Sequence, residues 1–432
     1  MNIYFNYNLP LFTYILLGIV LLCLLWILVF YIRRISRVTR AVRQANPDTE
    51  TAKSESADEA EQEESSPLVF SIDGDDAAPD VPVDDFTDTS GHDTAGLPAA
   101  SIVIYCQDQS SWLEEALPDI LAQVYEPGFE VIVVNEGGSD ATRDLVDGLS
   151  LAHPNLYLTY TPDGARNLSR KKLALTIGVK AAKNPVVVNV TAAVRIPSRN
   201  WLYSIMRNFA SEGVEIVLGY ACVIDGDDSY GRRRRAFDYI ADSVTWLTSA
   251  LAGKPYRGTE YNLTYTRDIF FRNKGFSRSL NLVNGDDDIF VNEISRRDNT
   301  VVELSYDSMT VANWLDHRAA QEDYLRRHYF TSRRLPRASA LLMASGAWAI
   351  WIALAAAVGA ALIQPGNMLP AAVALVLIIT ILLTVTLTWR RAMIALCSRR
   401  MFWTIPRLAM FRPLRMMRLA LRSRRAHNYT WN

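Results

Sequence analysis

Three long stretches without a charged side chain restrict this chain of 432 residues more than any other feature. They cover residues 11–31, 339–363 and 369–389. A helix rises about 1.5 Å per residue, so about 20 apolar residues cross a hydrocarbon core of roughly 30 Å. The first stretch is too long for the apolar part of a signal peptide, and it has neither a basic segment before it nor a small-residue cleavage site after it. The sequence therefore predicts one N-terminal transmembrane helix and a C-terminal transmembrane hairpin that turns at 364–368.

The charged residues are distributed unevenly, although the formal net charge is only −1. Residues 46–98 hold 16 Asp and Glu against the single Lys53, whereas residues 324–432 hold 16 Arg and no Asp or Glu. Arginines also follow the first apolar stretch. The positive-inside rule then puts the N-terminus outside and the central part of the chain in the cytoplasm. We expect a multi-pass protein of the bacterial inner (cytoplasmic) membrane, with the basic end against phospholipid head groups and no nucleic-acid partner.

The chain divides into five predicted segments. They are an N-terminal anchor with a basic flank (1–45), an acidic disordered linker (46–98), a globular domain (99–332), the transmembrane hairpin (333–391) and a basic amphipathic tail (392–432). The linker has no hydrophobic period, and about 53 flexible residues give it a root-mean-square reach of roughly 40 Å. The tail mixes apolar residues with Arg, which predicts interfacial helices on the inner leaflet. The alternative is a tail bound by another protein. The four Cys are scattered and indicate neither a disulfide framework nor a zinc site.

Strands and helices alternate in the globular domain. Short apolar runs rich in β-branched residues predict strands at 100–105, 129–134, 156–161 and 185–190. Helices are predicted at 112–124, 141–149 and 171–182. This alternation predicts an α/β fold with a mostly parallel sheet and helices on both faces. Ligands of such sheets bind at the carboxyl ends of the strands, which here are 105–108, 135–136 and 191–193.

An acidic turn with three adjacent carboxylates, Asp286, Asp287 and Asp288, follows Gly285 and precedes a short helical run. A carboxylate that accepts a proton from a hydroxyl belongs on such a turn, near polar groups that orient an acceptor. Taken alone, a solvated acidic turn is the simpler interpretation. The polar and aromatic segments at 258–263 and 270–276, and the basic segment at 326–329, favour a site.

Seven segments follow one another in an order typical of one family. They are Ser-Ile-Val-Ile at 101–104, Phe-Glu-Val-Ile-Val-Val-Asn-Glu-Gly-Gly-Ser-Asp at 129–140, Arg-Lys-Lys-Leu-Ala-Leu at 170–175, the segment 197–202 that ends in Trp-Leu, Gly-Thr-Glu-Tyr-Asn at 258–262, Gly-Asp-Asp at 285–287 and Tyr-Leu-Arg-Arg-His at 324–328. Together they resemble a membrane-anchored bacterial glycosyltransferase of family 2, with the GT-A fold. The resemblance covers a little over half of the chain.

The resemblance implies a Rossmann-like sheet and a sugar transfer, with inversion, from a nucleotide-sugar donor to an acceptor hydroxyl. Asp287 matches the general base, with Asp286 and Asp288 in support. The residues expected to bind the donor are Gln107, Asn135, Glu136, Lys172, Arg195, Arg327 and His328. Gly258 and Asn262 match the acceptor side. The hairpin beside the site suggests a membrane lipid or a lipid-linked or envelope glycan as the acceptor.

One family motif is missing, namely the DXD that holds Mg²⁺ or Mn²⁺ beside the donor diphosphate. Its position is Thr191-Ala192-Ala193, or one residue later, and no carboxylate occurs between Asp163 and Glu212. Such metals normally need at least one carboxylate oxygen. We therefore assign no metal ligand, although the family makes a divalent metal possible. Cationic side chains of the protein are one substitute, and the segment 225–228 is another, unless it is a solvated loop.

Two functions remain open at this point. The first is an inverting glycosyltransferase that acts on a lipid-linked or envelope glycan at the cytoplasmic face. The second is a catalytically inactive glycosyltransferase-like subunit that binds a nucleotide sugar or acts as a scaffold. The three adjacent carboxylates favour the first, and the missing DXD favours the second. The two helices of the hairpin are too few for a polysaccharide channel, which argues against a processive synthase.

Overall fold

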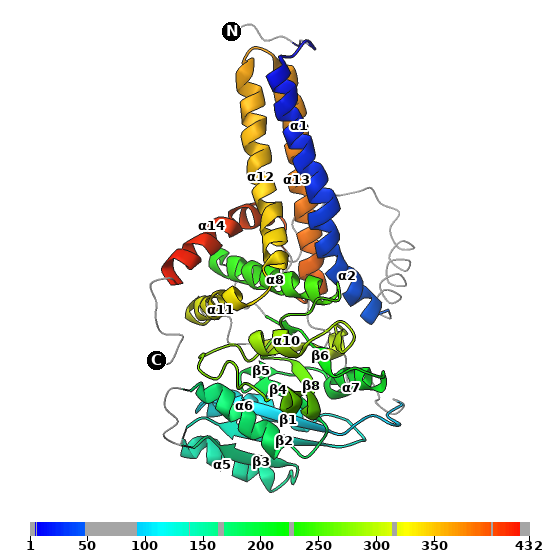
Figure 1. Cartoon of the computed structure of the whole chain (residues 1–432), viewed down its shortest axis with the longest axis vertical. Helices are drawn as coiled ribbons and strands as arrows, with labels where there is room; N and C mark the ends of the chain where they lie inside the picture. The colour runs from blue at the N-terminus through cyan, green and yellow to red at the C-terminus, as the bar shows by residue number, and fades with distance from the viewer. Residues whose placement is uncertain are drawn as a thin grey trace, which may run out of the picture.

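The structure is a computed structural model that describes residues 5, 7–47, 93–137, 139–162, 168–223, 229–312, 318–398 and 401–423. A bundle of long helices forms one end of the molecule, and an α/β domain forms the other (Figure 1). Most of the predicted acidic linker, and residues 424–432 of the tail, lie outside the described residues. The segment 225–228 also lies outside them.

Three helices in the bundle are long and apolar enough to cross a membrane, as the sequence predicted. The first runs from Leu11 to Ala45 as α1 (Leu11–Trp26), a π-helical turn η1 (Ile27–Ile32) and α2 (Arg33–Ala45). The other two are α12 (Ala338–Ile363) and α13 (Met368–Ala395). Asn367 caps α13 by accepting a hydrogen bond from the Leu369 N–H at 3.2 Å. Across the bundle, the indole N–H groups of Trp26 and Trp389 donate to Ser345 and Tyr31 at 3.1 and 3.0 Å.

The central sheet has seven strands in the order β3-β2-β1-β4-β8-β6-β9. Their bounds are β1 Ala100–Cys106, β2 Phe129–Asn135, β3 Leu156–Tyr160, β4 Val186–Thr191, β6 Ile216–Leu218, β8 Leu263–Thr266 and β9 Thr300–Val302. β8 runs antiparallel to both of its neighbours, and the other pairs are parallel. The predicted mostly parallel α/β fold is thus confirmed. In the register of β1, Cys106 lies opposite Asn135 and Tyr105 opposite Thr191, so these residues share one edge of the sheet.

Helices cover the sheet because its strands are apolar on both faces. They include α4 (Ser110–Leu121), α5 (Asp140–Ser150) and α6 (Arg170–Ala181). α6 packs closely on β1 because Gly178 has no side chain there; a Cβ at this position would lie 2.4 Å from a methyl group of Val103. This close packing holds α6 against β1.

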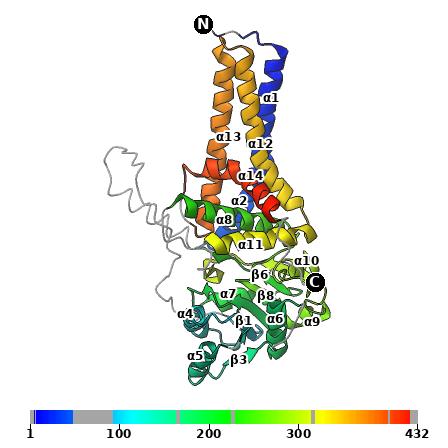
Figure 2. The same cartoon turned by 90° about the vertical axis from the view of Figure 1, so that its left-hand side faces the viewer.

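A layer of helices lies crosswise between the membrane bundle and the sheet, as both views show (Figure 1, Figure 2). It consists of α8 (Tyr230–Ala250), α11 (Arg318–Thr331) and α14 (Ile405–Ser423). α14 lies within the predicted basic tail (392–432), and Arg415 fixes it to α8 through two bonds to the Asp238 carboxylate, at 2.6 and 3.1 Å. A second sheet, of β5 (Val194–Arg195), β10 (Thr310–Ala312) and β7 (Ala221–Cys222), completes the domain.

Candidate active site

The acidic turn leads into α10 (Ile289–Ile294) and is buried. Gly285 begins it with φ +111°, a backbone conformation that residues with a side chain rarely adopt. The side chains of Asp286, Asp287 and Asp288 are 7, 9 and 1 % exposed. These low exposures exclude a solvated turn. Burial of three adjacent carboxylates is unfavourable unless each carboxylate has partners.

Asp288 is the structural carboxylate of the three. Its Oδ1 accepts the Ile289 N–H at 2.5 Å and caps α10, while its Oδ2 accepts a short hydrogen bond from the Thr331 hydroxyl. His328 Nδ1 lies 3.3 Å from the same Oδ2. Burial raises the pKa of Asp288, but hydrogen bonds from His328 and Thr331 outweigh it and hold the pKa below its usual value. Asp288 thus joins the turn to α11.

Asp287 is the candidate general base of the turn. Its Oδ2 lies 3.8 Å from His328 Nε2, so one imidazole ring lies between two adjacent carboxylates. Burial raises the pKa of Asp287 to about 7; His328 acts in the opposite direction, and the neighbouring carboxylates add to the rise. A carboxyl group that titrates near neutral pH is well matched to proton transfer from a hydroxyl.

Asp286 belongs to a buried ion network. Lys171 Nζ lies 2.7 Å from Asp286 Oδ2 and also forms a short ion pair with Glu260. Arg327 Nη1 lies 3.4 Å from the other oxygen of Glu260. Burial lowers the pKa of Lys171, but Asp286 and Glu260 outweigh it and raise the pKa above the usual value. The network fixes two cations from different helices beside the acidic turn.

A cavity of about 690 Å³ lies in front of this network, and we call it the donor cavity. Residues from the strand ends, α6 and α11 line it, among them Tyr105, Gln107, Glu136, Arg170, Lys171, Thr191, Ala193, Glu260, Asp323 and Arg327. The cavity is therefore at the carboxyl ends of the strands, where the sequence predicted a ligand site. Its size is typical of sites for small organic ligands, which span about 300–1,000 Å³.

The other end of the donor cavity is formed by the strand ends. Asn135 accepts the Asp108 N–H at 3.2 Å and donates to the Asp108 carboxylate at 3.1 Å, which fixes the loop after β1. Glu136 accepts the Tyr105 hydroxyl at 2.5 Å and lies 3.3 Å from Arg170. Gln107 is exposed in the cavity wall. Of the predicted donor residues, the structure thus brings Gln107, Glu136 and Arg327 around one space, whereas Asn135 is fully buried and neither Asn135 nor His328 lines the cavity.

Lys172 and Arg195 lie elsewhere. The Lys172 ammonium group is fully buried and donates to the backbone oxygens of Ser279 and Asn284, at 2.7 and 2.8 Å. It thereby supports the segment that leads into the acidic turn, and Lys171 faces the cavity instead. Arg195 binds Asp119 of α4 at 2.7 Å and does not line the donor cavity. For donor binding we therefore replace both residues by Arg170 and Lys171.

Gly258 contacts the acidic turn, whereas Asn262 binds other backbone oxygens of the domain. The Gly258 N–H donates to the Asp287 backbone oxygen at 2.8 Å. A Cβ on Gly258 would lie 3.2 Å from both Leu218 and Leu263, so the close approach favours glycine. The Asn262 amide is buried and donates to the backbone oxygens of Tyr220 and Ser308, at 3.2 and 2.7 Å. Both residues contact protein; a contact of either with an acceptor stays a prediction.

The residues at the DXD position do not fit a metal. Thr191 and Ala193 line the donor cavity, and neither offers a carboxylate. Elsewhere, Asp287, Asp288 and His328 could each offer one ligand atom, and these atoms lie within 4.8 Å of one another. However, both oxygens of Asp288 already accept hydrogen bonds, and one of them faces His328. We assign no step to a metal.

Lys171, Glu260 and Thr331 are site residues that the sequence analysis did not assign. Helical periodicity offers a signal for the first. On α6 the buried face runs through Lys172, Leu175 and Val179, at spacings of three and four residues. Lys172 therefore points into the protein and Lys171 lies beside that face. Glu260 and Thr331 carry no such signal, because their partners are distant in the sequence.

The fold is a mostly parallel α/β sheet of the GT-A type, next to three helices that are long and apolar enough to cross a membrane. Residues 101–281 match the model of "Glycosyl transferase family 2". This region of the chain thus matches the family 2 glycosyltransferase domain, a class of enzyme domain that acts on nucleotide sugars. A comparison with curated protein sequences found no match.

Several solved structures are similar to the chain. One is a mannosyltransferase from Pyrobaculum calidifontis in complex with GDP-Man and Mn²⁺, at 22% identity and TM-score 0.45 over 71% of this chain and 87% of that one. Another is S. aureus TarS 1–349 in complex with UDP-GlcNAc. Its sequence identity is 13% and its TM-score 0.37, over 66% of this chain and 72% of that one. Glucosyl-3-phosphoglycerate synthase from Mycobacterium tuberculosis, with phosphoglyceric acid, has 17% identity and TM-score 0.33 over 49% and 71%. The family match, and not these similarities, identifies the domain.

Proposed function

We propose that the chain is an inverting glycosyltransferase that moves a sugar from a nucleotide diphosphate to a hydroxyl of a lipid-linked or envelope glycan. The reaction takes place at the cytoplasmic face of a bacterial inner membrane. The observation that carries the proposal is the buried Asp287, next to the cation network of the donor cavity and below the helices that could span a membrane. Arginines on the domain side of these helices support the orientation.

The proposed step needs one base and several cations. The acceptor oxygen attacks the anomeric carbon of the sugar, and its proton passes to Asp287. The bond from that carbon to the diphosphate breaks on the opposite face, so the configuration inverts. Lys171, Arg170 and Arg327 stabilise the negative charge that develops on the diphosphate, and Arg offers a forked donor set for this. The same cations pair with Glu136 and Glu260, so the diphosphate competes with these carboxylates.

A non-catalytic nucleotide-sugar-binding or scaffold subunit is the second candidate. The observation that favours it is the sequence Thr191-Ala192-Ala193 at the DXD position. A non-catalytic function leaves the buried Asp287 without a role, however. A buried carboxylate whose pKa is raised toward neutral pH is more typical of a functional site than of a structural one.

The first test is a transfer assay. Membranes that contain the full chain are incubated with a panel of labelled nucleotide sugars, in EDTA and then in Mn²⁺. We expect label in the lipid or glycan fraction without added metal, and less transfer at high salt, because partly exposed charge pairs are screened. Transfer that requires Mn²⁺ would show that a ligand outside the DXD position holds a metal. Donor binding without transfer under any condition would favour the scaffold.

The second test is the pH dependence of kcat/KM. The reaction needs the deprotonated form of Asp287, and burial raises the pKa of this group to about 7. We therefore expect kcat/KM to rise with pH and to level off above about 7, with a fall of about tenfold per pH unit on the acid side. His328 lowers the pKa of Asp287, so His328→Gln should move the midpoint to higher pH. A profile with an ordinary aspartate midpoint in both proteins would contradict the assignment.

A further inference from the structure

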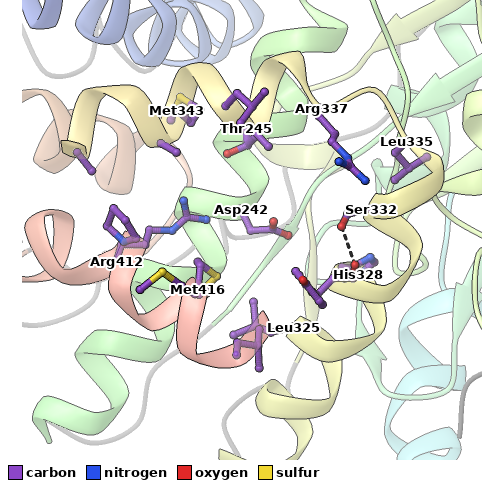
Figure 3. A pocket seen from close by; sticks show the side chains of 18 of the residues that line it. Asp242, Thr245, Leu325, His328, Ser332, Leu335, Arg337, Met343, Arg412 and Met416 are labelled. Carbon is purple, nitrogen blue, oxygen red and sulfur yellow. Dashed lines mark hydrogen bonds between the residues drawn. The ribbon is translucent and has the colours of Figure 1, made fainter. Parts of the chain in front are cut away.

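A second cavity, of about 660 Å³, lies where the membrane bundle meets the crosswise helices (Figure 3). We call it the junction cavity. Side chains from α8, α11, α12, α13 and α14 line it, and most of them are apolar, including Phe237, Leu325, Met343, Trp389 and Met416. A polar donor could not fill such a space favourably, because its hydroxyl and phosphate groups would lose their hydrogen bonds to water.

One end of the junction cavity faces the membrane side of the molecule. Leu341 and Trp348 of α12 line the cavity and are 65 and 42 % exposed, and Met417 of α14 is 52 % exposed. α12 is one of the helices that could span a membrane. Exposed apolar side chains at the mouth of an apolar cavity are stable when lipid chains cover them. This end therefore suits the hydrocarbon part of a lipid.

The other end is polar and mainly cationic. Arg257, Arg333, Arg337 and Arg412 line the cavity, whereas Asp242 is the one carboxylate among its described lining residues. Asp242 pairs with Arg257 at 2.8 Å. The Nε of Arg412 is buried without a hydrogen-bond partner among the described residues, and it lies 4.0 Å from Asp238. In Figure 3 the side chains of Arg412 and Arg337 point toward Asp242, Ser332 and His328. This excess of positive charge suits an anionic head group.

Helix α11 separates the two cavities. Arg327 lines the donor cavity and the next residue, His328, lines the junction cavity. His328 Nε2 is also 3.8 Å from Asp287 Oδ2. A hydroxyl group that reaches His328 from the junction cavity thus lies beside the imidazole ring that contacts the candidate base. Each cavity thus contains a residue that contacts the acidic turn, Lys171 in the donor cavity and His328 in the junction cavity.

We propose that the junction cavity binds the acceptor, a membrane lipid whose head group carries a phosphate and a free hydroxyl. This rests on the proposed function. The chains leave the cavity past Leu341 and Trp348, the phosphate binds Arg412 and Arg337, and the hydroxyl lies at His328 beside Asp287. The cavity volume suits a head group with the first part of its chains.

The test uses the full chain in phosphatidylcholine nanodiscs. The probe is phosphatidylglycerol with a photoreactive diazirine in one acyl chain, and a diacylglycerol with the same diazirine chain is the phosphate-free comparison. We expect the first probe to label α12 and α14 near the cavity. Ala347→Trp and Met416→Trp fill the cavity from two helices and should lower labelling by about tenfold. Ile352→Trp is the matched control, because Ile352 is 52 % exposed on α12 and does not line the cavity.

The phosphate is tested separately. Arg412→Gln should reduce labelling by phosphatidylglycerol and leave labelling by diacylglycerol unchanged, whereas Arg418→Gln, an exposed position on the same helix, should change neither. Equal labelling of Ala347→Trp and Ile352→Trp would overturn the site, and equal labelling by both probes would overturn phosphate recognition. Labelling needs no nucleotide sugar, so this experiment tests the lipid site independently of sugar transfer. Ala347→Trp with wild-type transfer to lipid would refute the acceptor route.

Discussion

Asp287→Asn is expected to lower the rate of sugar transfer by about 10²–10⁴ while nucleotide binding stays unchanged. The amide keeps the shape of the side chain but cannot accept the proton of the acceptor hydroxyl. The backbone of the turn keeps its bond from Gly258, and Asp288 still caps α10, so the fold should persist. Steady-state transfer by the full chain in nanodiscs measures the loss, and calorimetric titration of UDP or GDP measures binding.

Three control variants make this prediction specific. Asp298→Asn removes an exposed carboxylate just beyond α10 and should leave the rate unchanged. Asp286→Asn and Asp288→Asn should lower the rate less than Asp287→Asn, since these side chains pair with Lys171 and cap α10. The melting temperature of each variant separates loss of fold from loss of chemistry. Full turnover by Asp287→Asn would remove Asp287 from the mechanism.

Lys171→Met is expected to have the second largest effect, with a rate lower by about 10²–10³ and weaker binding of UDP or GDP. Lys171 lies at the donor cavity and pairs with both Glu260 and Asp286. Its loss removes a fixed positive charge from the diphosphate side and leaves Asp286 without its ion-pair partner. Arg327 still pairs with Glu260, so part of the network remains. Nucleotide titration and transfer rates measure the two effects.

The fold must be monitored in this variant, because breaking a buried ion pair typically costs about 3–5 kcal/mol. Lys171→Arg keeps the charge and should recover most of the binding. Lys180→Met is the matched control, because Lys180 is exposed on the same helix. Nucleotide affinity that is equal in the wild type and a folded Lys171→Met variant would show that the donor diphosphate binds elsewhere.

Local patterns in the sequence were sufficient for the scaffold. Apolar runs of transmembrane length predicted the three long helices, and the alternation of short strands with helices predicted a mostly parallel sheet, which the structure shows with one antiparallel strand, β8. Both features follow from residues that are close in the sequence. Position at the strand ends likewise predicted that Gln107 and Glu136 would share a site.

Partners that come from distant parts of the chain could not be predicted in this way. Family resemblance assigned the donor role to Lys172. The Lys172 ammonium group points into the protein, however, and the neighbouring Lys171, on another face of the helix, lines the cavity. Arg195 pairs with Asp119, a carboxylate on α4, and does not line the donor cavity. The bond between Thr331 and Asp288 joins residues 43 positions apart, which no periodicity reveals. The burial of the acidic turn depends on such contacts.

The most direct test of the central claim compares the wild-type chain with Asp287→Asn in EDTA, in nanodiscs, with nucleotide binding and sugar transfer measured on the same samples. A donor site built on protein cations, with Asp287 as the base, predicts equal nucleotide affinity in both proteins and a transfer rate that is lower by about 10²–10⁴ in Asp287→Asn. Equal transfer rates in the two proteins would contradict it, as would nucleotide binding by the wild type that appears only after Mn²⁺ is added.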